Sequence, residues 1–246
     1  MAFLSLKSYA ADCLGVTPPF SVLTHVFGNI FRDANGTVFG GQTETLSIRR
    51  QIQLGKGRST NFSIFLVGHE NDFSGVVTLA QCIEVQFAIQ VARDLYSQVN
   101  LGVRKIYWRR IGMDKVGNYA IITDKPEAID LTDDFSGPND GIDVFFVQSI
   151  LNAGGWSTTP GPCDKDEKDE MTGAVLELSG SSNFFTGVLM AHEVGHYLGL
   201  QHDGTINNVM GVDSNNDGIG EISSSSTQLT SSQGTTIRGH CSVSSC

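Results

Sequence analysis

The chain has 246 residues, a formal net charge of −10, an apolar fraction of 40% and a charged fraction of 17%. This length suffices for one large domain or for a domain with an extension, and the composition is that of an ordinary globular protein. The acidic balance argues against nucleic acid as a partner, because phosphate binding needs clustered Lys and Arg. No apolar run is long enough to span a bilayer.

Residues 1–58 are predicted to form an N-terminal extension, which is either an added β element or the remnant of a pro-segment. They contain strand-like runs such as residues 45–54. Residues 1–7 lack the charged leader and long apolar stretch of a secretory signal. The many Ser, Gly, Thr and Asn residues favour a secreted, extracellular protein whose signal peptide is absent from this sequence, with a cytoplasmic location as the alternative.

Next come a strand, a long helix and further strands. Residues 61–68 are short, apolar and closed by glycine, which predicts a buried strand. Residues 78–99 predict a long helix, because apolar side chains recur at four-residue steps: Leu79, Ile83, Phe87, Val91 and Leu95. Further strands are predicted at 103–111, 119–123, 141–150 and 173–179. A strand, helix, strand order needs a crossover connection, so the sheet should be partly parallel.

A second helix is predicted from about Asn183 or Phe184, with Ser182 or Asn183 as its cap. It leads into the most informative stretch, residues 192–202, which reads His-Glu-Val-Gly-His-Tyr-Leu-Gly-Leu-Gln-His. His192 and His196 are four residues apart, so on a helix both imidazoles project from one face, as a pair of zinc ligands requires.

Glu193 lies beside this pair and can act as a general base on a water molecule at the metal. Gly199 suits the position just past a helix end, where the chain can turn back and bring His202 to the same metal. Three histidine ligands leave a fourth tetrahedral position open, which is typical of catalytic zinc.

Met210 follows His202 by eight residues, and together these residues resemble the metzincin signature, His-Glu-x-x-His-x-x-Gly-x-x-His with a methionine-bearing turn. The resemblance implies one catalytic Zn²⁺ held by three histidines, with Glu193 as base and Met210 as the apolar floor. A gap-filling core methionine is the alternative for Met210. The short spacing to Met210 is similar to matrix metalloproteinases, whereas Asp203 directly after the third histidine is similar to adamalysins. Val212 stands where astacins and serralysins carry a tyrosine.

The resemblance covers about residues 59–246 and implies an α+β catalytic domain. Its parts would be a twisted, mixed five-stranded sheet, a long backing helix, an active-site helix and a small C-terminal subdomain. In that family the strand before the active-site helix is the sheet edge that pairs with substrate. The matching segment is 173–179, with Gly173, Ala174, Val175 and Leu176 at its start. An extended polypeptide would bind antiparallel to it.

After the methionine, residues 213–221 place side-chain oxygens at alternate positions, as the first half of a calcium loop does. The candidate ligands are Asp213, Asn215, Asp217 and Glu221. The twelfth position is Ser224, where a calcium loop of this type carries glutamate, so the segment fits either a Ca²⁺ site or a surface turn.

Near the C-terminus, Leu229, Gln233 and Ile237 fall four apart and predict a short, weak helix within residues 223–238. The five cysteines form no metal-ligand pattern. Cys241 and Cys246 are close enough to bridge a small loop, and Cys82 is predicted to be a core residue. The run 163–170, dense in charges of both signs, is expected to be a solvated loop.

The sequence therefore predicts a zinc-dependent endopeptidase that hydrolyses peptide bonds in polypeptide substrates. The alternative is a non-catalytic, zinc-stabilised adhesion or binding module. Such a module would gain nothing from a carboxylate beside an open metal position, so Glu193 favours the enzyme.

Overall fold

The structure is a computed structural model that describes residues 54, 56–70, 74–166, 170–178, 182–214 and 220–245. The interpretations of residues 1–58 lie almost wholly outside these residues. None of the helices in the described part of the chain is long and apolar enough to cross a membrane.

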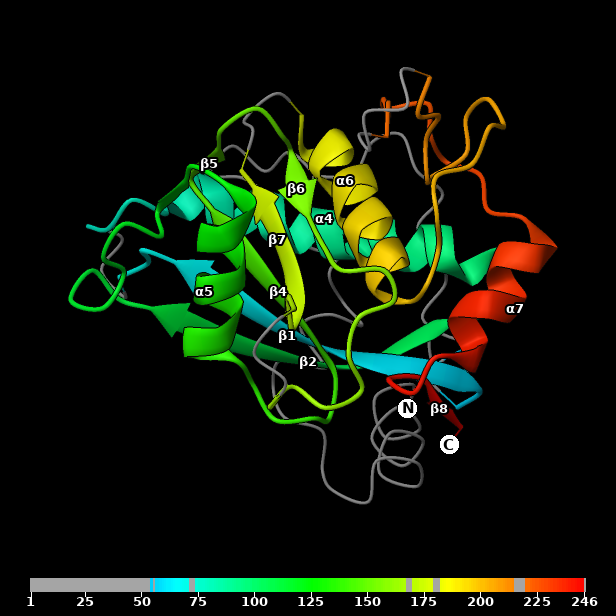
Figure 1. Ribbon diagram of the computed structural model, residues 1–246, viewed down its shortest axis with the longest axis horizontal. Coiled ribbons are helices and arrows are strands. Elements are labelled where there is room, and N and C mark those ends of the chain that lie inside the picture. Colours follow the sequence, from blue (N-terminus) through cyan, green and yellow to red (C-terminus); the bar gives the residue numbers. More distant parts are fainter. Residues whose placement is uncertain are drawn as a thin grey trace, which may run out of the picture.

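A mixed sheet forms the centre of the fold (Figure 1). Its strands run in the order β2-β1-β4-β7-β6, and β8 pairs with β1. The three inner pairings, β2 with β1, β1 with β4 and β4 with β7, are parallel, whereas β6 pairs antiparallel with β7 and β8 antiparallel with β1. The strands are β1 (Arg58–Val67), β2 (Gly102–Ile111), β4 (Ile142–Val147), β6 (Gly155–Trp156), β7 (Gly173–Glu177) and β8 (Ser244–Ser245). This arrangement confirms the predicted α+β class with its mixed sheet, and β8 adds a short strand to the five expected.

The predicted strand at residues 141–150 is divided, because β4 is followed by a separate strand β5 (Ser149–Ile150). β5 pairs in parallel with β3 (Ile121–Ile122) to form a second, two-stranded sheet.

Four helices surround the sheets in the described part of the chain: α4 (Leu79–Ser97), α5 (Lys125–Phe135), α6 (Asn183–Tyr197) and α7 (Ser231–Gly239). The long predicted helix is α4, and it begins at a capping box in which Thr78 and Gln81 bond reciprocally. Helix α5 was not predicted from the sequence, although Asp124 caps it and a proline occupies its first turn. The helix predicted within 223–238 is confirmed as α7, which is shorter.

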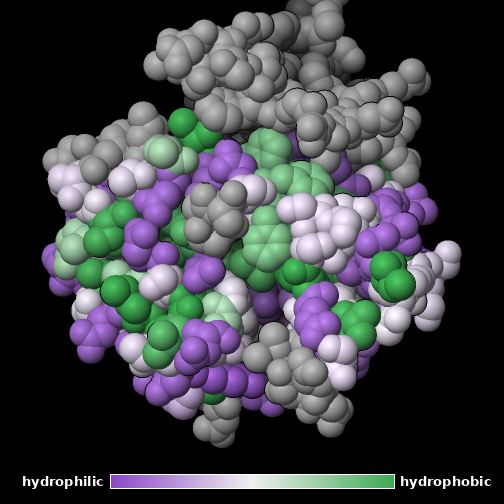
Figure 2. Space-filling model, turned by 90° about the horizontal axis from the view of Figure 1, so that it is seen from above, coloured by the Kyte–Doolittle hydropathy of each residue, from purple (hydrophilic) through white to green (hydrophobic). Residues whose placement is uncertain are grey.

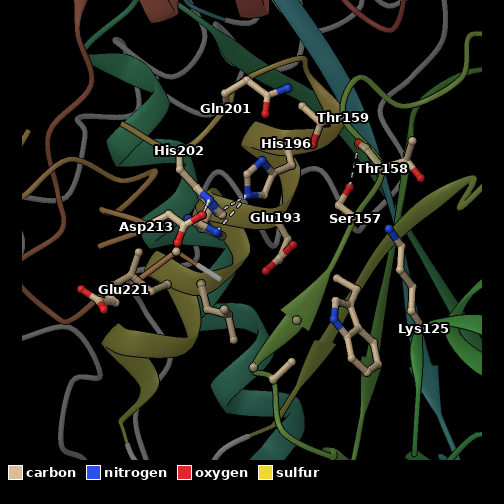
Figure 3. Close-up of a pocket in the computed structure, with 18 of the residues that line it drawn as sticks. Lys125, Ser157, Thr158, Thr159, Glu193, His196, Gln201, His202, Asp213 and Glu221 are labelled. Atoms are coloured by element: carbon tan, nitrogen blue, oxygen red, sulfur yellow. Dashed lines mark hydrogen bonds and ion pairs between the residues drawn. The ribbon is translucent and has the colours of Figure 1, made fainter. Parts of the chain in front are cut away.

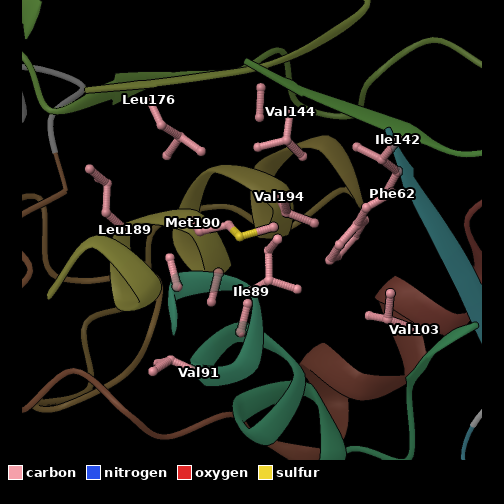
Figure 4. Close-up of a cluster of buried hydrophobic side chains, with 14 of the residues drawn as sticks. Phe62, Ile89, Val91, Val103, Ile142, Val144, Leu176, Leu189, Met190 and Val194 are labelled. Atoms are coloured by element: carbon pink, nitrogen blue, oxygen red, sulfur yellow. The ribbon is translucent and has the colours of Figure 1, made fainter. Parts of the chain in front are cut away.

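The two faces of the sheet carry separate hydrophobic clusters. Side chains alternate along β4, so Val144 and Phe146 pack with α4 and α6, whereas Phe145 and Val147 pack with α5. Figure 4 shows the larger cluster, where Met190 and Val194 of α6 meet Ile89 of α4 beneath the sheet. This packing fixes α6 between α4 and the sheet, so the motif that α6 carries has a rigid base.

One disulfide joins Cys163 to Cys241, across 78 residues of sequence. The suggested pairing of Cys241 with Cys246 is therefore wrong, because proximity in sequence does not decide which thiols the fold brings together. Cys82 is a buried free cysteine, as expected.

The run 163–170 is not simply a solvated loop either. Lys165 is buried, and its Nζ lies 2.9 Å from Oδ1 of the buried Asp143.

Candidate metal centre

Helix α6 brings two of the three motif histidines to one place. Its N-cap Ser182 accepts a hydrogen bond from the backbone N–H of Phe185 at 3.0 Å, as the sequence predicted. The helix ends after Tyr197, and Gly199 has φ +95°, a left-handed conformation that glycine adopts at little cost. The chain therefore turns back and places His202 beside α6.

The three imidazole rings converge through their Nε2 atoms. The Nε2 atom of His196 lies 3.1 Å from that of His192 and 3.1 Å from that of His202. Ligands bound tetrahedrally to zinc at about 2.0–2.1 Å are about 3.3 Å apart, so the spacing fits one shared ion. Among the described residues, these histidines form a group whose ligand atoms lie within 4.8 Å of one another.

Backbone carbonyls hold the first two rings in the orientation that a ligand needs. His192 donates from Nδ1 to the carbonyl of Val209 at 2.9 Å, and His196 donates from Nδ1 to the carbonyl of Leu200 at 2.7 Å. A carbonyl can only accept, so Nδ1 carries the proton and the Nε2 lone pair faces the other histidines. His202 has a carboxylate near its Nδ1, the Oδ2 of Asp213 at 4.0 Å.

The electrostatics keep the imidazoles of His192 and His196 neutral, as a metal ligand must be. Desolvation, reinforced by the neighbouring His196, lowers the pKa of His192 to about 3. Desolvation also lowers the pKa of His196 to about 4, although its hydrogen bond to Leu200 acts in the opposite direction. Neutral nitrogen donors with fixed tautomers and converging lone pairs fit Zn²⁺.

Glu193 lies next to this cluster but is not part of it. It is 5% exposed, and burial raises the pKa of its carboxyl to about 8. Strand β6 packs against it: a Cβ built on Gly155 would lie 2.8 Å from Oε1 of Glu193. In Figure 3 the Glu193 side chain extends into the space between the histidines and β6.

Met210 lies directly beneath α6. It is fully buried, and a Cβ built on Gly195 would lie 2.7 Å from its sulfur atom. The structure thus places Met210 under the helical turn that joins the first two histidines, and its role as the floor of the metal site stays a prediction.

A cleft of about 900 Å³ runs past this cluster (Figure 3). One wall comes from α6, a second from Asp213 and residues 220–222, and a third from residues 153–159 around β6. Lys125, the first residue of α5, also lines it. From above, hydrophobic and hydrophilic residues are interspersed over the described surface (Figure 2).

The sheet edge at this cleft is β6, so the assignment of residues 173–179 as the edge is wrong for the described residues 173–178. Gly173, Ala174, Val175 and Leu176 are buried in β7, which pairs with β4 on one side and with β6 on the other. β7 is apolar because it is covered on both faces, which is typical of an inner strand. Strand β6 was not predicted from the sequence, because two residues are too few to show an alternating pattern.

Only two of the four predicted calcium ligands, Asp213 and Glu221, lie among the residues that the structure describes. Asn215 and Asp217 lie outside the described residues. Asp213 approaches His202, and Glu221 accepts a hydrogen bond from the Ser214 hydroxyl at 2.5 Å. Ca²⁺ binding therefore stays a prediction.

Comparisons with known proteins agree with this geometry. Residues 139–245 match the family model described as Metallo-peptidase family M12B Reprolysin-like, a range that contains all three histidines, Glu193 and Met210. The match confirms the predicted resemblance to metzincin-type zinc peptidases and supports a zinc ion at this cluster. No curated protein matches the chain.

Two solved structures are among those that match this chain. One is titled "Structure of a chaperone-substrate complex", with 14% identity and a TM-score of 0.42, covering 61% of this chain and 25% of that one. The chain thus spans about a quarter of that protein's length. The other is archaemetzincin from Methanopyrus kandleri, with 13% identity and a TM-score of 0.42, covering 63% of this chain and 82% of that one.

Proposed function

We propose that the protein is a zinc-dependent endopeptidase, in which His192, His196 and His202 hold the ion and Glu193 is the general base. The observation that carries the proposal is the convergence of three imidazole Nε2 atoms beside the buried carboxyl group of Glu193, at the wall of a cleft. A zinc ion held by these three histidines would supply Lewis acidity for the scissile carbonyl and for the attacking water.

Glu193 then moves the proton. Its carboxylate takes a proton from the attacking water and gives it to the leaving amine, so one side chain acts first as base and then as acid. A carboxyl whose pKa is raised by burial toward neutrality suits both steps. Met210 has no proton to move, and in this proposal it supports the helical turn that carries the ligands.

In this proposal the polypeptide substrate binds along β6 and not along β7. β6 is the last strand of the sheet order and lines the cleft, so an extended polypeptide can pair with its outer side. Main-chain pairing holds a peptide irrespective of its side chains, which suits cleavage within a chain. The disulfide between Cys163 and Cys241 supports an oxidising, extracellular setting.

The test compares the parent protein with Glu193→Ala on an unbiased peptide mixture, with bound zinc measured in both. We expect the variant to keep its zinc and to lose about 10²- to 10⁴-fold in kcat. Glu170→Ala, at an exposed position outside the cleft, is the matched control and should cleave like the parent. Undiminished cleavage by Glu193→Ala would contradict the proposed mechanism, and zinc binding without cleavage in the parent would support the binding module.

A further inference from the structure

Helix α7 begins with a capping box whose glutamine also reaches the methionine turn. The Thr230 hydroxyl accepts from the backbone N–H of Gln233 at 3.2 Å, and Gln233 Oε1 accepts from the Thr230 N–H at 2.8 Å. Helix α4 has the same box, formed by Thr78 and Gln81. Gln81 also donates from Nε2 to Gln148 Oε1 at 3.2 Å, whereas Gln233 is 8% exposed and bonds to a residue of the methionine turn.

The bonds to that turn form a reciprocal amide pair with Asn208. Asn208 donates from Nδ2 to Gln233 Oε1 at 3.0 Å, and Gln233 donates from Nε2 to Asn208 Oδ1 at 2.9 Å. The same Oδ1 accepts the backbone N–H of Met210 at 2.9 Å, and Asn208 is only 1% exposed. Removing one amide would therefore leave buried polar atoms of the other without partners, which is costly in a protein interior.

The turn held by this pair supplies the partner of a metal-site histidine. Val209 directly follows Asn208, and its carbonyl accepts the Nδ1 proton of His192. The Val209 N–H is itself bonded to the carbonyl of Gln228 at 2.9 Å, so the backbone of Val209 is held through both its N–H and its carbonyl. Gln233 of α7 is thus connected to His192: hydrogen bonds join Gln233 to Asn208, the backbone joins Asn208 to Val209, and the Val209 carbonyl bonds to His192.

We propose that Gln233 is a positioning residue for the metal centre: through Asn208 it fixes the Val209 carbonyl that orients His192. The inference rests on the proposed metal site. Partners in the outer shell of a metal typically change its affinity by 10- to 100-fold when they are lost. Gln233 therefore affects metal retention as well as the stability of α7.

The test separates these two effects with variants that break a helix cap and keep the Asn208–Gln233 pair. Gln233→Leu removes both the cap bond and the amide pair, whereas Thr230→Ala removes a cap bond of α7 and keeps the pair. Gln81→Leu breaks the equivalent box of α4. For each protein, the rate of Zn²⁺ release to excess chelator, the visible spectrum of the Co²⁺-substituted form and the unfolding midpoint in urea are measured.

We expect Gln233→Leu to release Zn²⁺ about 10- to 100-fold faster than the parent and to show an altered Co²⁺ spectrum. The two cap variants should lower the unfolding midpoint and leave metal release within about threefold. A second variant, Gln233→Glu, keeps the Oε1 acceptor but replaces the Nε2 donor with a carboxylate oxygen that faces Asn208 Oδ1 and Asp203 Oδ2, and it should also release Zn²⁺ faster.

Two results would overturn the inference, and they are distinguishable. If the parent binds Zn²⁺ but both Gln233 variants release it like the cap variants, the positioning role is wrong and the proposed function stands. If the parent binds no Zn²⁺, the proposed function fails together with this inference.

Discussion

Lys165 forms a buried ion pair with Asp143 whose loss has a calculable cost. The side chains are 4% and 0% exposed, and their charged atoms are 2.9 Å apart. Lys165 also donates to the carbonyl of Pro138 at 3.1 Å, and Asp143 accepts from the N–H of Gly137 at 2.6 Å. The change considered is Lys165→Met, which keeps the volume of the stem and leaves the carboxylate without its cation.

At pH 7 this change should lower the free energy of unfolding by about 3 to 5 kcal/mol, the usual cost of removing one partner of a buried pair. Desolvation already raises the pKa of Asp143, and the Lys165 charge is the main influence that lowers it. Without Lys165 the folded-state pKa therefore rises further above the unfolded value of about 3.9.

The sign of the pH dependence follows from this shift. A carboxyl whose folded pKa is raised binds its proton more tightly in the folded state, so its ionisation destabilises the fold as pH rises from about 4 through the folded pKa. We expect the deficit of Lys165→Met to be smallest near pH 4 and to grow toward pH 7.

Urea unfolding at several pH values checks this. The double variant Asp143→Asn with Lys165→Met keeps an acceptor for Gly137 and has no charge, so it should recover most of the loss at pH 7. A deficit below about 1 kcal/mol in Lys165→Met, or one that does not change with pH, would refute the reasoning.

Two further predictions concern the cleft and the disulfide. Gly155→Ala should lower kcat at least about tenfold with zinc content unchanged, because the new methyl group displaces the Glu193 carboxylate. Gly204→Ala is the control, because a Cβ built there meets nothing within 4 Å. Equal kcat values for Gly155→Ala and the parent in steady-state assays would contradict the placement of β6 beside Glu193. Cys163→Ser should lower the free energy of unfolding by about 2 to 4 kcal/mol, measured in urea, because it opens a loop of 78 residues. Equal unfolding midpoints in urea for the variant and the parent would show that the disulfide between Cys163 and Cys241 does not stabilise the fold.

Local patterns in the sequence predicted much of the fold. The four-residue apolar steps of residues 78–99 correspond to α4, and the short apolar run at 61–68 overlaps β1. The histidine spacing predicted a metal site because helix geometry alone brings His192 and His196 together. Gly199 then predicted the turn that returns His202. Each of these features depends on neighbours within about one or two turns of the chain.

The features that were missed depend on long-range pairing. Whether β7 is an edge or an inner strand is decided by Gly155 and Trp156, which lie about 20 residues earlier and show no alternation of their own. The partner of Cys241 is Cys163, which no local rule identifies. The Asn208–Gln233 pair likewise joins residues 25 positions apart, and the four-residue spacing of Gln233 predicted only its helix.

The central claim is that one zinc ion on the three histidines carries the peptidase activity, and a metal titration tests it most directly. The protein is stripped with a chelator, Zn²⁺ is added back in steps, and peptide cleavage and bound metal are measured at each step. The account predicts that cleavage disappears on stripping and returns in proportion to Zn²⁺ up to one ion per chain, and that His202→Ala regains none of it. Cleavage that persists in the stripped protein, or that returns without bound zinc, would contradict it.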